Sequence, residues 1–412
     1  MSQIASCRIC GSSQFELIID LGLQALTGIF PQNPKHDDFP RGPLRLVRCI
    51  AEDGCGLVQL EHSFDPKIMY GENYGYRSGL NASMVNHLRE HVAKIASRVS
   101  LMDGDVVCDI GSNDGTTLGF YSPLLVRIGI DPTIAKFKKY YPSGAVTISD
   151  FFSAKAVLDA SGRRRAKVVT SFSMMYDLED PQSFVNEVAS VLADDGIWVF
   201  EQSYLPLMLN RRAFDTICHE HLEYYGVRQI DWLLRRAGLE VIDIELNDVN
   251  GGSFAVTAAH AKAFPVADSV NKTRTEESVM WDDARSVFAE FAEVTRQTSE
   301  ALCSFVRTQR DKGKTVAGLG ASTKGNVLLQ VAGLTNSDIS VIGDVNPDKF
   351  GCVTPGSWIP IVPQEEALDG EFDFYVVLPW HFREFFLRSS SFTGCRLVFP
   401  LPKLEVVEVL PE

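Results

Sequence analysis

Short runs of apolar residues, each followed by polar or glycine residues, recur between residues 106 and 203. Runs of this length, rich in valine and isoleucine, predict buried strands, and the segments between them have helical spacing. The alternation favours a parallel sheet with helices on both faces, which makes the fold class α/β. The predicted strands are Val106–Asp109, Val126–Ile130, Val146–Phe152, Lys167–Ser171 and Gly196–Glu201.

The pattern differs before and after this stretch. Helical spacing of apolar residues predicts a helix from about Ser83, a helix over 229–238 and one or two long helices over 268–312. Strands are expected over 240–246 and 255–259, joined by a hairpin turn, and residues 22–43 are rich in glycine and proline and predict a loop. A second α/β unit follows, with strands over 315–318, 340–343 and 372–378 and a helix over 326–333. We therefore expect a small N-terminal module (1–65), a central domain (66–265, with a helical lead-in over 66–105) and a helical linker with a C-terminal Rossmann-like domain (266–412).

Composition and charge narrow the function classes. The chain has 412 residues, 45% of them hydrophobic and 22% charged, which is typical of a globular protein of several domains. Its net charge of −14, without a long basic run, disfavours nucleic-acid binding. No apolar run of about 20 residues predicts a membrane span, and no signal segment opens the chain. These features predict a cytoplasmic protein without nucleic-acid or membrane partners, and they leave its oligomeric state open.

Cysteines are concentrated near the start of the chain, where four of the nine precede residue 56. Cys7 and Cys10 form a C-x-x-C pair followed by glycine, and Cys49 and Cys55 form a second, looser pair. Four thiolates in two pairs can hold one tetrahedral Zn²⁺ ion with no open position, so we expect a structural zinc site. The alternative is that Cys49 or Cys55 is a small buried apolar residue.

The strand at 106–109 leads into a glycine-rich loop, Asp109-x-Gly111-x-Asn113-x-Gly115. This spacing resembles motif I of the class I S-adenosylmethionine (SAM) methyltransferases; the alternative is an ordinary strand–turn–helix. Ligands of such sheets bind beyond the carboxyl ends of the strands, where an acidic residue can accept the ribose hydroxyls. Asp131 would take this role, and Asp150 with Phe151 would contact the adenine. The polar residues at the predicted strand ends are Asp109, Asp131, Asp150, Ser171 and Glu201.

A second group of residues has the chemistry of a catalytic site. His219, Glu220 and His221 are consecutive, and an imidazole beside a carboxylate is held in one tautomer and becomes a better general base. The alternatives are a metal site or an ordinary helix end. Tyrosines 70, 74 and 76 precede the first long helix and either pack or offer hydroxyls to a ligand. A glycine-rich turn at 318–325 could cradle a phosphate with Lys324 as its charge, unless this half is a Rossmann-like unit without a ligand.

Several stretches together resemble the sugar C-methyltransferases of deoxysugar biosynthesis over nearly the whole chain. They are Cys7-x-x-Cys10, CGLVQL (55–60), YGYRSG (74–79), FDTI-x-HEH (214–221), NGGSF (250–254), GLGASTKGN (318–326) and VTPGSWIPI (353–361). The resemblance implies a SAM-dependent enzyme with a structural zinc ion, acting on a nucleotide-linked 4-keto sugar. It implies that His221 is the catalytic base, assisted by Glu220 and Tyr76. By domain analogy, the substrate would contact Tyr74, Tyr224, Ser322, Lys324 and His381.

Two positions depart from the family pattern. Cys218 stands where the family usually has tyrosine, and SFSMMYDLEDP (171–181) replaces a stretch that usually bears asparagine and histidine. Both lie where the sugar ring is expected, so the resemblance implies the methylation chemistry more strongly than the sugar. An O- or N-methyltransferase and a non-catalytic SAM-fold scaffold are the alternative functions.

Overall fold

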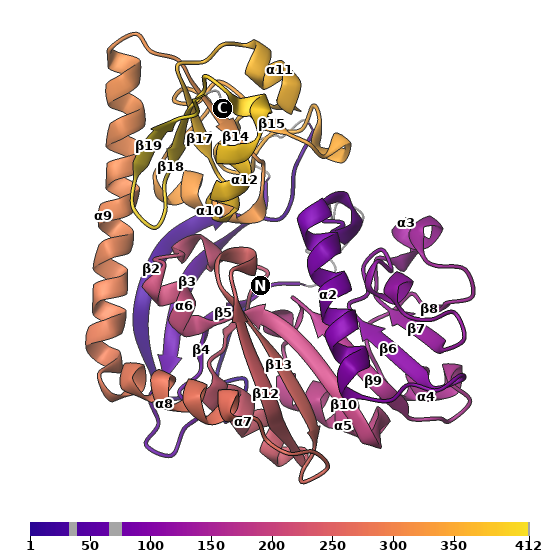
Figure 1. Cartoon of the computed structure of the whole chain (residues 1–412). Helices are drawn as coiled ribbons and strands as arrows, with labels where there is room; N and C mark the ends of the chain where they lie inside the picture. The colour runs from indigo at the N-terminus through magenta and orange to yellow at the C-terminus, as the bar shows by residue number, and fades with distance from the viewer. Residues whose placement is uncertain (33–38, 66–75, 411–412) are drawn as a thin grey trace.

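The protein folds around three main β-sheets, seen in a computed structural model that describes residues 1–32, 39–65 and 76–410 (Figure 1). A seven-stranded sheet occupies the centre of the sequence, a four-stranded sheet contains the N-terminal strands, and a six-stranded sheet contains the C-terminal strands. The predicted α/β fold class is confirmed, with a Rossmann-like central sheet, a small N-terminal unit and a second α/β unit near the C-terminus. The proposed domain boundaries stay predictions.

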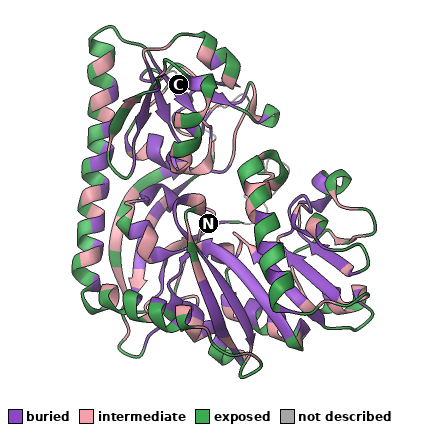
Figure 2. Ribbon diagram, in the orientation of Figure 1, coloured by how far each residue is buried: buried purple, intermediate pink, exposed green. Residues whose placement is uncertain are grey.

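The central sheet has the strand order β12-β13-β10-β9-β6-β7-β8, in which β6 to β10 run parallel and β12 and β13 are antiparallel. Its inner strands are buried on both faces, because helices cover each side (Figure 2). Every fully buried valine, isoleucine or phenylalanine in such a strand contributes about 1.5–3 kcal/mol. The strands are β6 (Val106–Ile110), β7 (Val126–Ile130), β8 (Val146–Ile148), β9 (Ala166–Phe172), β10 (Leu192–Ser203), β12 (Leu239–Asn247) and β13 (Ser253–His260).

Helices and short helical turns connect these strands. The α-helices of this part are α2 (Ala82–Arg98), α3 (Ile134–Phe137), α4 (Ala154–Ala160), α5 (Pro181–Val191), α6 (Leu205–Asn210) and α7 (Val227–Arg236). The 3-10 turns are η2 (Ser78–Leu80), η3 (Thr117–Phe120), η4 (Lys138–Tyr140), η5 (Met175–Asp177), η6 (Phe214–Thr216) and η7 (Val249–Gly251).

Two details of this sheet differ from expectation. The strand predicted over 146–152 ends at Ile148, so Asp150 and Phe151 lie in the loop beyond it. The glycine loop leads into the 3-10 turn η3 and not into an α-helix.

The N-terminal sheet has the order β11-β4-β3-β2, with β2 (Phe15–Ala25), β3 (Arg41–Cys49), β4 (Val58–Leu60) and β11 (Glu223–Tyr224). A two-stranded pair, β1 (Ser2–Gln3) with β5 (His62–Ser63), lies beside it. The prediction of a loop over 22–43 is wrong at both ends, because β2 continues to Ala25 and β3 begins at Arg41. Gly22, with a φ of 81°, lies within a register shift of β2, so this glycine marks an irregularity inside a strand.

Two helices carry the chain to the C-terminal sheet: α8 (Asp268–Asp282) and the long α9 (Ala284–Asp311), which runs beside β2 and up to the last domain (Figure 1). The six-stranded sheet contains β14 (Val316–Leu319), β15 (Ile342–Asp344), β16 (Ile361–Pro363), β17 (Phe374–Val377), β18 (Arg396–Phe399) and β19 (Glu405–Glu408). Its helices are α10 (Thr323–Val331), α11 (Gln364–Asp369) and α12 (Arg383–Arg388), with turns η8 (Pro347–Lys349), η9 (Trp380–Phe382) and η10 (Ser390–Phe392). Among the described helices, none has the length and apolar character needed to cross a membrane.

Candidate active site

The glycine loop after β6 has the backbone that its sequence requires. Gly111, Asn113 and Gly115 all have positive φ, at 68°, 48° and 75°. A Cβ atom on Gly115 would lie 2.7 Å from the Tyr141 ring, so only glycine fits there. Asp109 lies below the loop, where its Oδ1 accepts a 2.6 Å hydrogen bond from the Thr170 hydroxyl. Burial raises the pKa of Asp109 to about 7, against the opposite effect of hydrogen bonds with Thr170 and with Thr117, which follows the loop. Through Thr117, the carboxyl contacts the end of the glycine loop from inside.

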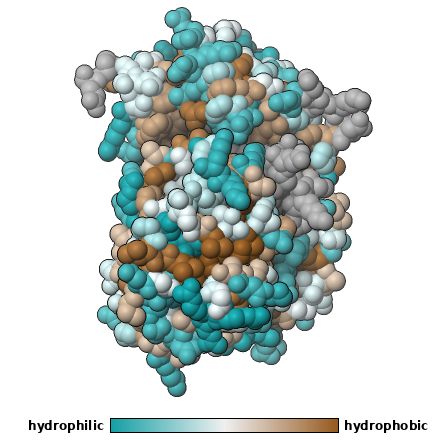
Figure 3. All heavy atoms as spheres, turned by 90° about the vertical axis from the view of Figure 1, so that its right-hand side faces the viewer, coloured by the Kyte–Doolittle hydropathy of each residue, from teal (hydrophilic) through white to brown (hydrophobic). Residues whose placement is uncertain are grey.

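The remaining predicted cofactor residues differ in exposure. Asp131 accepts hydrogen bonds from the Asn113 backbone at 3.0 Å and from Thr133, so it ties the end of β7 to the glycine loop. Asp150 and Phe151 are exposed beyond β8, with 52% of Phe151 accessible. Ser171 is buried, and its hydroxyl accepts a hydrogen bond from the Trp198 indole, so only its backbone can face a ligand. The face that lies on the right in Figure 1 carries a band of hydrophobic residues across a mostly hydrophilic surface (Figure 3).

The segment before α2 packs directly on the glycine loop. The Ser78 backbone donates to Asn113 Oδ1 at 3.0 Å, the Gly79 backbone donates to Asp114, and the Asn113 amide donates to the Tyr76 carbonyl. Tyr76 is therefore held beside the predicted cofactor loop, and about half of its surface is exposed. Tyr74 lies outside the described residues.

His221 is positioned by the turn η6 and by an aromatic neighbour. Its Nδ1 lies 3.0 Å from the Thr216 carbonyl, which fixes the proton on Nδ1 and leaves Nε2 with a free lone pair. The Tyr176 ring packs against the imidazole, with centroids 4.1 Å apart. Burial and the charge of Lys324 lower the pKa of His221 to about 3. The imidazole is thus neutral at physiological pH and can accept a proton at Nε2.

The neighbours of His221 in sequence point elsewhere, and this corrects one expectation. Glu220 lies against Gly28, whose Cβ atom would be 1.9 Å from Glu220 Oε1, and it faces Thr323 and Lys349 of the C-terminal domain. Burial raises the pKa of Glu220 to about 7. A backbone carbonyl, not this carboxylate, therefore sets the His221 tautomer, and the environment makes the imidazole less basic.

His219 and Cys218 have structural positions in the same segment. His219 is buried, with Nε2 3.1 Å from the Gly42 carbonyl and Nδ1 3.3 Å from the Thr27 hydroxyl. It fastens the segment to the N-terminal sheet. Cys218 is fully buried in an apolar cluster, and burial raises its pKa well above the ordinary value. It therefore packs as a neutral thiol.

The C-terminal domain contributes charged side chains to the same place, through contacts of α10 with η6 and of η9 with η7. Lys324 donates to the Asn250 carbonyl at 2.5 Å, and its charge acts on Asp215, His221 and His381. His381 Nδ1 is buried, and no described group is within hydrogen-bond distance of it. Burial and Lys324 lower the pKa of His381 to about 3, so it too is neutral.

The side chains of the other two predicted substrate residues, Ser322 and Tyr224, make hydrogen bonds within the protein. Ser322 caps α10, because its hydroxyl accepts a hydrogen bond from the Gly325 backbone at 3.0 Å. Tyr224 is buried, and its hydroxyl lies 3.4 Å from the Thr216 carbonyl that also meets His221. Tyr224 therefore borders the His221 site through Thr216, and the hydroxyls of both residues already have partners.

Sequence reasoning missed two residues of this site. Tyr176, which covers the His221 ring, lies in the stretch 171–181 that departs from the family pattern, so that departure was its signal. Asp215 belongs to the FDTI segment (214–217) but was not singled out. It is fully buried, accepts a 2.8 Å hydrogen bond from the Trp380 indole and lies near Lys324, while burial raises its pKa.

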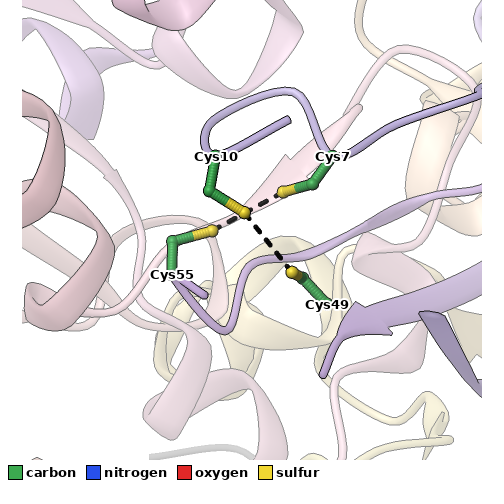
Figure 4. Close-up of side chains that lie close together, drawn as sticks. All are labelled: Cys7, Cys10, Cys49 and Cys55. Carbon is green, nitrogen blue, oxygen red and sulfur yellow. Dashed lines mark hydrogen bonds between the residues drawn. The ribbon is translucent and has the colours of Figure 1, made fainter. Parts of the chain in front are cut away.

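The four N-terminal cysteines converge at the base of the small sheet (Figure 4). The sulfur atoms of Cys7 and Cys55 are 3.5 Å apart, as are those of Cys10 and Cys49. These distances are too long for a disulfide, near 2.05 Å, and are close to the separation of about 3.8 Å between sulfurs bound to one tetrahedral Zn²⁺. The cluster therefore fits the predicted structural zinc site.

Comparisons with known proteins agree with this architecture. Three family models match successive parts of the chain: "Putative zinc binding domain" over 7–70, "Methyltransferase domain" over 84–244 and "C-methyltransferase C-terminal domain" over 248–402. The C-methyltransferase NovU of Streptomyces niveus is 32% identical over 98% of this chain and 97% of its own length.

The solved structures that are similar to this chain are more distant. A SAM-dependent methyltransferase from Clostridium acetobutylicum is 11% identical over 43% of this chain and 92% of its own, with a TM-score of 0.34. The magnesium protoporphyrin IX methyltransferase from Synechocystis PCC 6803, with bound SAM, is 12% identical over 43% of this chain and 82% of its own, with a TM-score of 0.31. The assignment therefore rests on the sequence matches: the chain is a SAM-dependent methyltransferase that belongs to the C-methyltransferase family.

Proposed function

We propose that this enzyme transfers a methyl group to a carbon atom next to the ketone of a nucleotide-linked 4-keto-deoxysugar. The observation that carries the proposal is the His221 imidazole, neutral and with a free Nε2, between the methyltransferase and C-terminal domains. A general base must be unprotonated before it can accept a proton, and a neighbouring ketone acidifies the C–H bond that has to be broken. The relative NovU is named as a C-methyltransferase, which supports the same reaction class.

The residues of the site suggest which group removes the proton from the substrate carbon and which group stabilises the enolate that forms. Nε2 of His221 accepts the proton from the carbon next to the ketone, and the electron pair of the C–H bond becomes part of an enolate. Its oxyanion can be stabilised by the Tyr76 hydroxyl. Tyr176 holds the imidazole in place, and Glu220 supports the segment from its other side. SAM, when bound, supplies the electrophilic methyl group that the enolate carbon attacks.

SAM and the nucleotide sugar would occupy opposite sides of this site. The glycine loop (Gly111, Asn113 and Gly115), supported by Asp109, would hold SAM together with the Ser171 backbone. Asp131 would bind the ribose, and Asp150 with the exposed Phe151 ring would contact the adenine. The nucleotide sugar would lie toward the C-terminal domain, where its anionic diphosphate would meet Lys324 and the amino end of α10. Tyr74, Tyr224, Ser322 and His381 would border it.

The deciding experiment identifies the new bond. Incubation with SAM carrying a ¹³C-methyl group and a panel of nucleotide-linked 4-keto-deoxysugars is expected to yield a ¹³C-methyl group bonded to carbon, detected by NMR. A methyl group on oxygen or nitrogen would instead support the alternative methyltransferase class. Absence of transfer to every sugar, with SAM bound, would contradict the proposed substrate.

The pH dependence tests the state of His221. Only the neutral imidazole can accept the proton, and the pKa of His221 is lowered to about 3. This group should therefore cause no loss of kcat/KM between pH 8 and about pH 5, whereas an ordinary histidine would cause a loss below about pH 6.5. Initial rates across this range measure the profile. A tenfold fall per pH unit beginning near 6.5 would contradict the assignment.

Lys324 is expected to bind the anionic part of the substrate. Replacing it with methionine keeps much of the side-chain volume but removes the charge, so KM for the nucleotide sugar should rise by about 10- to 100-fold. Affinity for SAM, measured by calorimetry, should stay unchanged. Lys314→Met, at a surface ion pair with Asp373, is the matched control. An unchanged KM in the Lys324 variant would remove this residue from the substrate site.

A further inference from the structure

A second group of metal-ligating side chains lies apart from the cysteine cluster and is not used by the proposed reaction. His87 and His91 are one turn apart on α2, and Glu201 is near the end of β10. Their side chains are largely buried, with exposures of 17%, 7% and 3%. One donor atom from each residue lies close to the other two.

The distances between these donors match the coordination shell of one ion. His87 Nε2 is 2.8 Å from Glu201 Oε1 and 3.0 Å from Oε2, and His91 Nε2 is 2.9 Å from Oε2. The two nitrogens are 3.1 Å apart. Two ligands bound at about 2.1 Å and at right angles are about 3.0 Å apart, whereas tetrahedral ligands are about 3.4 Å apart. The triangle therefore fits three adjacent positions of an octahedral shell.

Hydrogen bonding alone satisfies this arrangement poorly. If both Nε2 atoms carry protons, each can donate to the Glu201 carboxylate, but two N–H groups then face each other at 3.1 Å. If one Nε2 is unprotonated, its lone pair faces the carboxylate oxygen instead. A cation between the three atoms removes both conflicts, because it accepts electron pairs from both nitrogens and from the oxygen.

A neighbouring residue already orients the carboxylate. The Asn247 amide donates a 2.6 Å hydrogen bond to Glu201 Oε2, an outer contact of the kind that fixes metal-binding carboxylates. Two imidazoles and one carboxylate suit first-row transition metals such as zinc, and disfavour Mg²⁺ and Ca²⁺, which prefer oxygen donors.

We propose that His87, His91 and Glu201 bind a second divalent transition-metal ion, which joins α2 to β10. A metal ion there would also stabilise the candidate active site, because the segment just before α2 contacts the glycine loop. Ser78 and Gly79 bond the glycine loop, and Tyr76 is held there, so an ion that fixes α2 also fixes this segment. The ion is a structural clamp on the SAM side of the site.

Metal content tests the proposal directly. After equilibration with micromolar Zn²⁺ and gel filtration, mass spectrometry should find about two zinc ions per wild-type chain and about one in His91→Gln. His260→Gln is the matched control, because His260 bonds the Leu192 carbonyl away from both clusters, and it should keep about two. About one zinc ion in the wild type, equal to the His91 variant, would overturn the proposal.

A measurement on the wild type alone covers the case in which the variant fails to fold. Protein holding zinc only at the cysteines is titrated with Co²⁺ and followed by visible absorption. Binding that saturates at about one equivalent, with weak d–d bands and no sulfur-to-cobalt charge transfer, supports the site. Absence of saturable binding, or a spectrum with sulfur ligation, rejects it.

Discussion

Replacing His221 with glutamine is expected to lower kcat by about 10²- to 10⁴-fold, the range supplied by a general base. Glutamine can still donate to the Thr216 carbonyl from its amide, so the segment keeps its support, but it offers no basic nitrogen. SAM binding should be unaffected, because the glycine loop is contacted by the segment 76–79 rather than by His221. Single-turnover rates and SAM calorimetry measure the two effects separately.

His260→Gln serves as the control for this experiment, since it makes the same chemical change away from the site. Solvent deuterium gives a second readout. In wild-type enzyme supplied with S-adenosylhomocysteine, the hydrogen next to the ketone should exchange, and in the His221 variant this exchange should be lost as well. A variant with a rate near that of the wild type would show that another group removes the proton.

Loss of the cysteine-bound zinc should have the second large effect. Structural zinc sites contribute about 10–16 kcal/mol of binding free energy in zinc-finger peptides, and this energy supports folding. Cys10→Ser should therefore lower the temperature of the first thermal unfolding transition and release zinc, as calorimetry and metal analysis would show. Cys303→Ser, on α9 and away from the cluster, is the control. It should keep both the wild-type transition temperature and the bound zinc.

The zinc site should also affect catalysis, because its second knuckle contacts the segment that follows His221. The Gln229 amide donates to the Cys55 carbonyl at 2.9 Å, and β4 pairs with β11, which begins two residues after His221. Cys10→Ser is thus expected to lower kcat as well as stability. Full activity in a zinc-free chain that remains folded would contradict this coupling between the cysteine cluster and the His221 site.

The pattern of hydrophobic and polar residues along the sequence was sufficient to predict most strands of the parallel part of the central sheet. The strand over 126–130 was predicted with its observed bounds, and the strands around 106, 167 and 196 differ only at their ends. These strands are buried on both faces and read as continuous apolar runs, which is why local pattern locates them. The strands β18 and β19, which pair antiparallel with each other, were not predicted.

Functional features could be predicted from the sequence where the residues that form them are close together along the chain. The two cysteine pairs indicated zinc because each pair forms its own knuckle, and the tertiary fold then joins them. The loop Gly111–Gly115 was recognisable because its backbone conformation requires glycine. His221 was identified from a short motif and a family resemblance, and its catalytic role stays a prediction.

Long-range contacts decided everything else about the site. The sequence could not show that Glu220 turns away from His221, because adjacent residues in a turn point in different directions. It could not show that Tyr176 covers the imidazole, that Lys324 approaches from the C-terminal domain, or that His87 and His91 meet Glu201. The contact between Tyr176 and His221 joins residues 45 positions apart, and that between His87 and Glu201 joins residues 114 positions apart. Local propensity holds no information about contacts of this kind. The sequence alone determined the type of fold, the zinc ligands and the glycine loop, because these depend on local spacing. Tertiary packing decided the partners of the proposed catalytic groups and the direction of their pKa shifts, because burial and neighbouring charges set both.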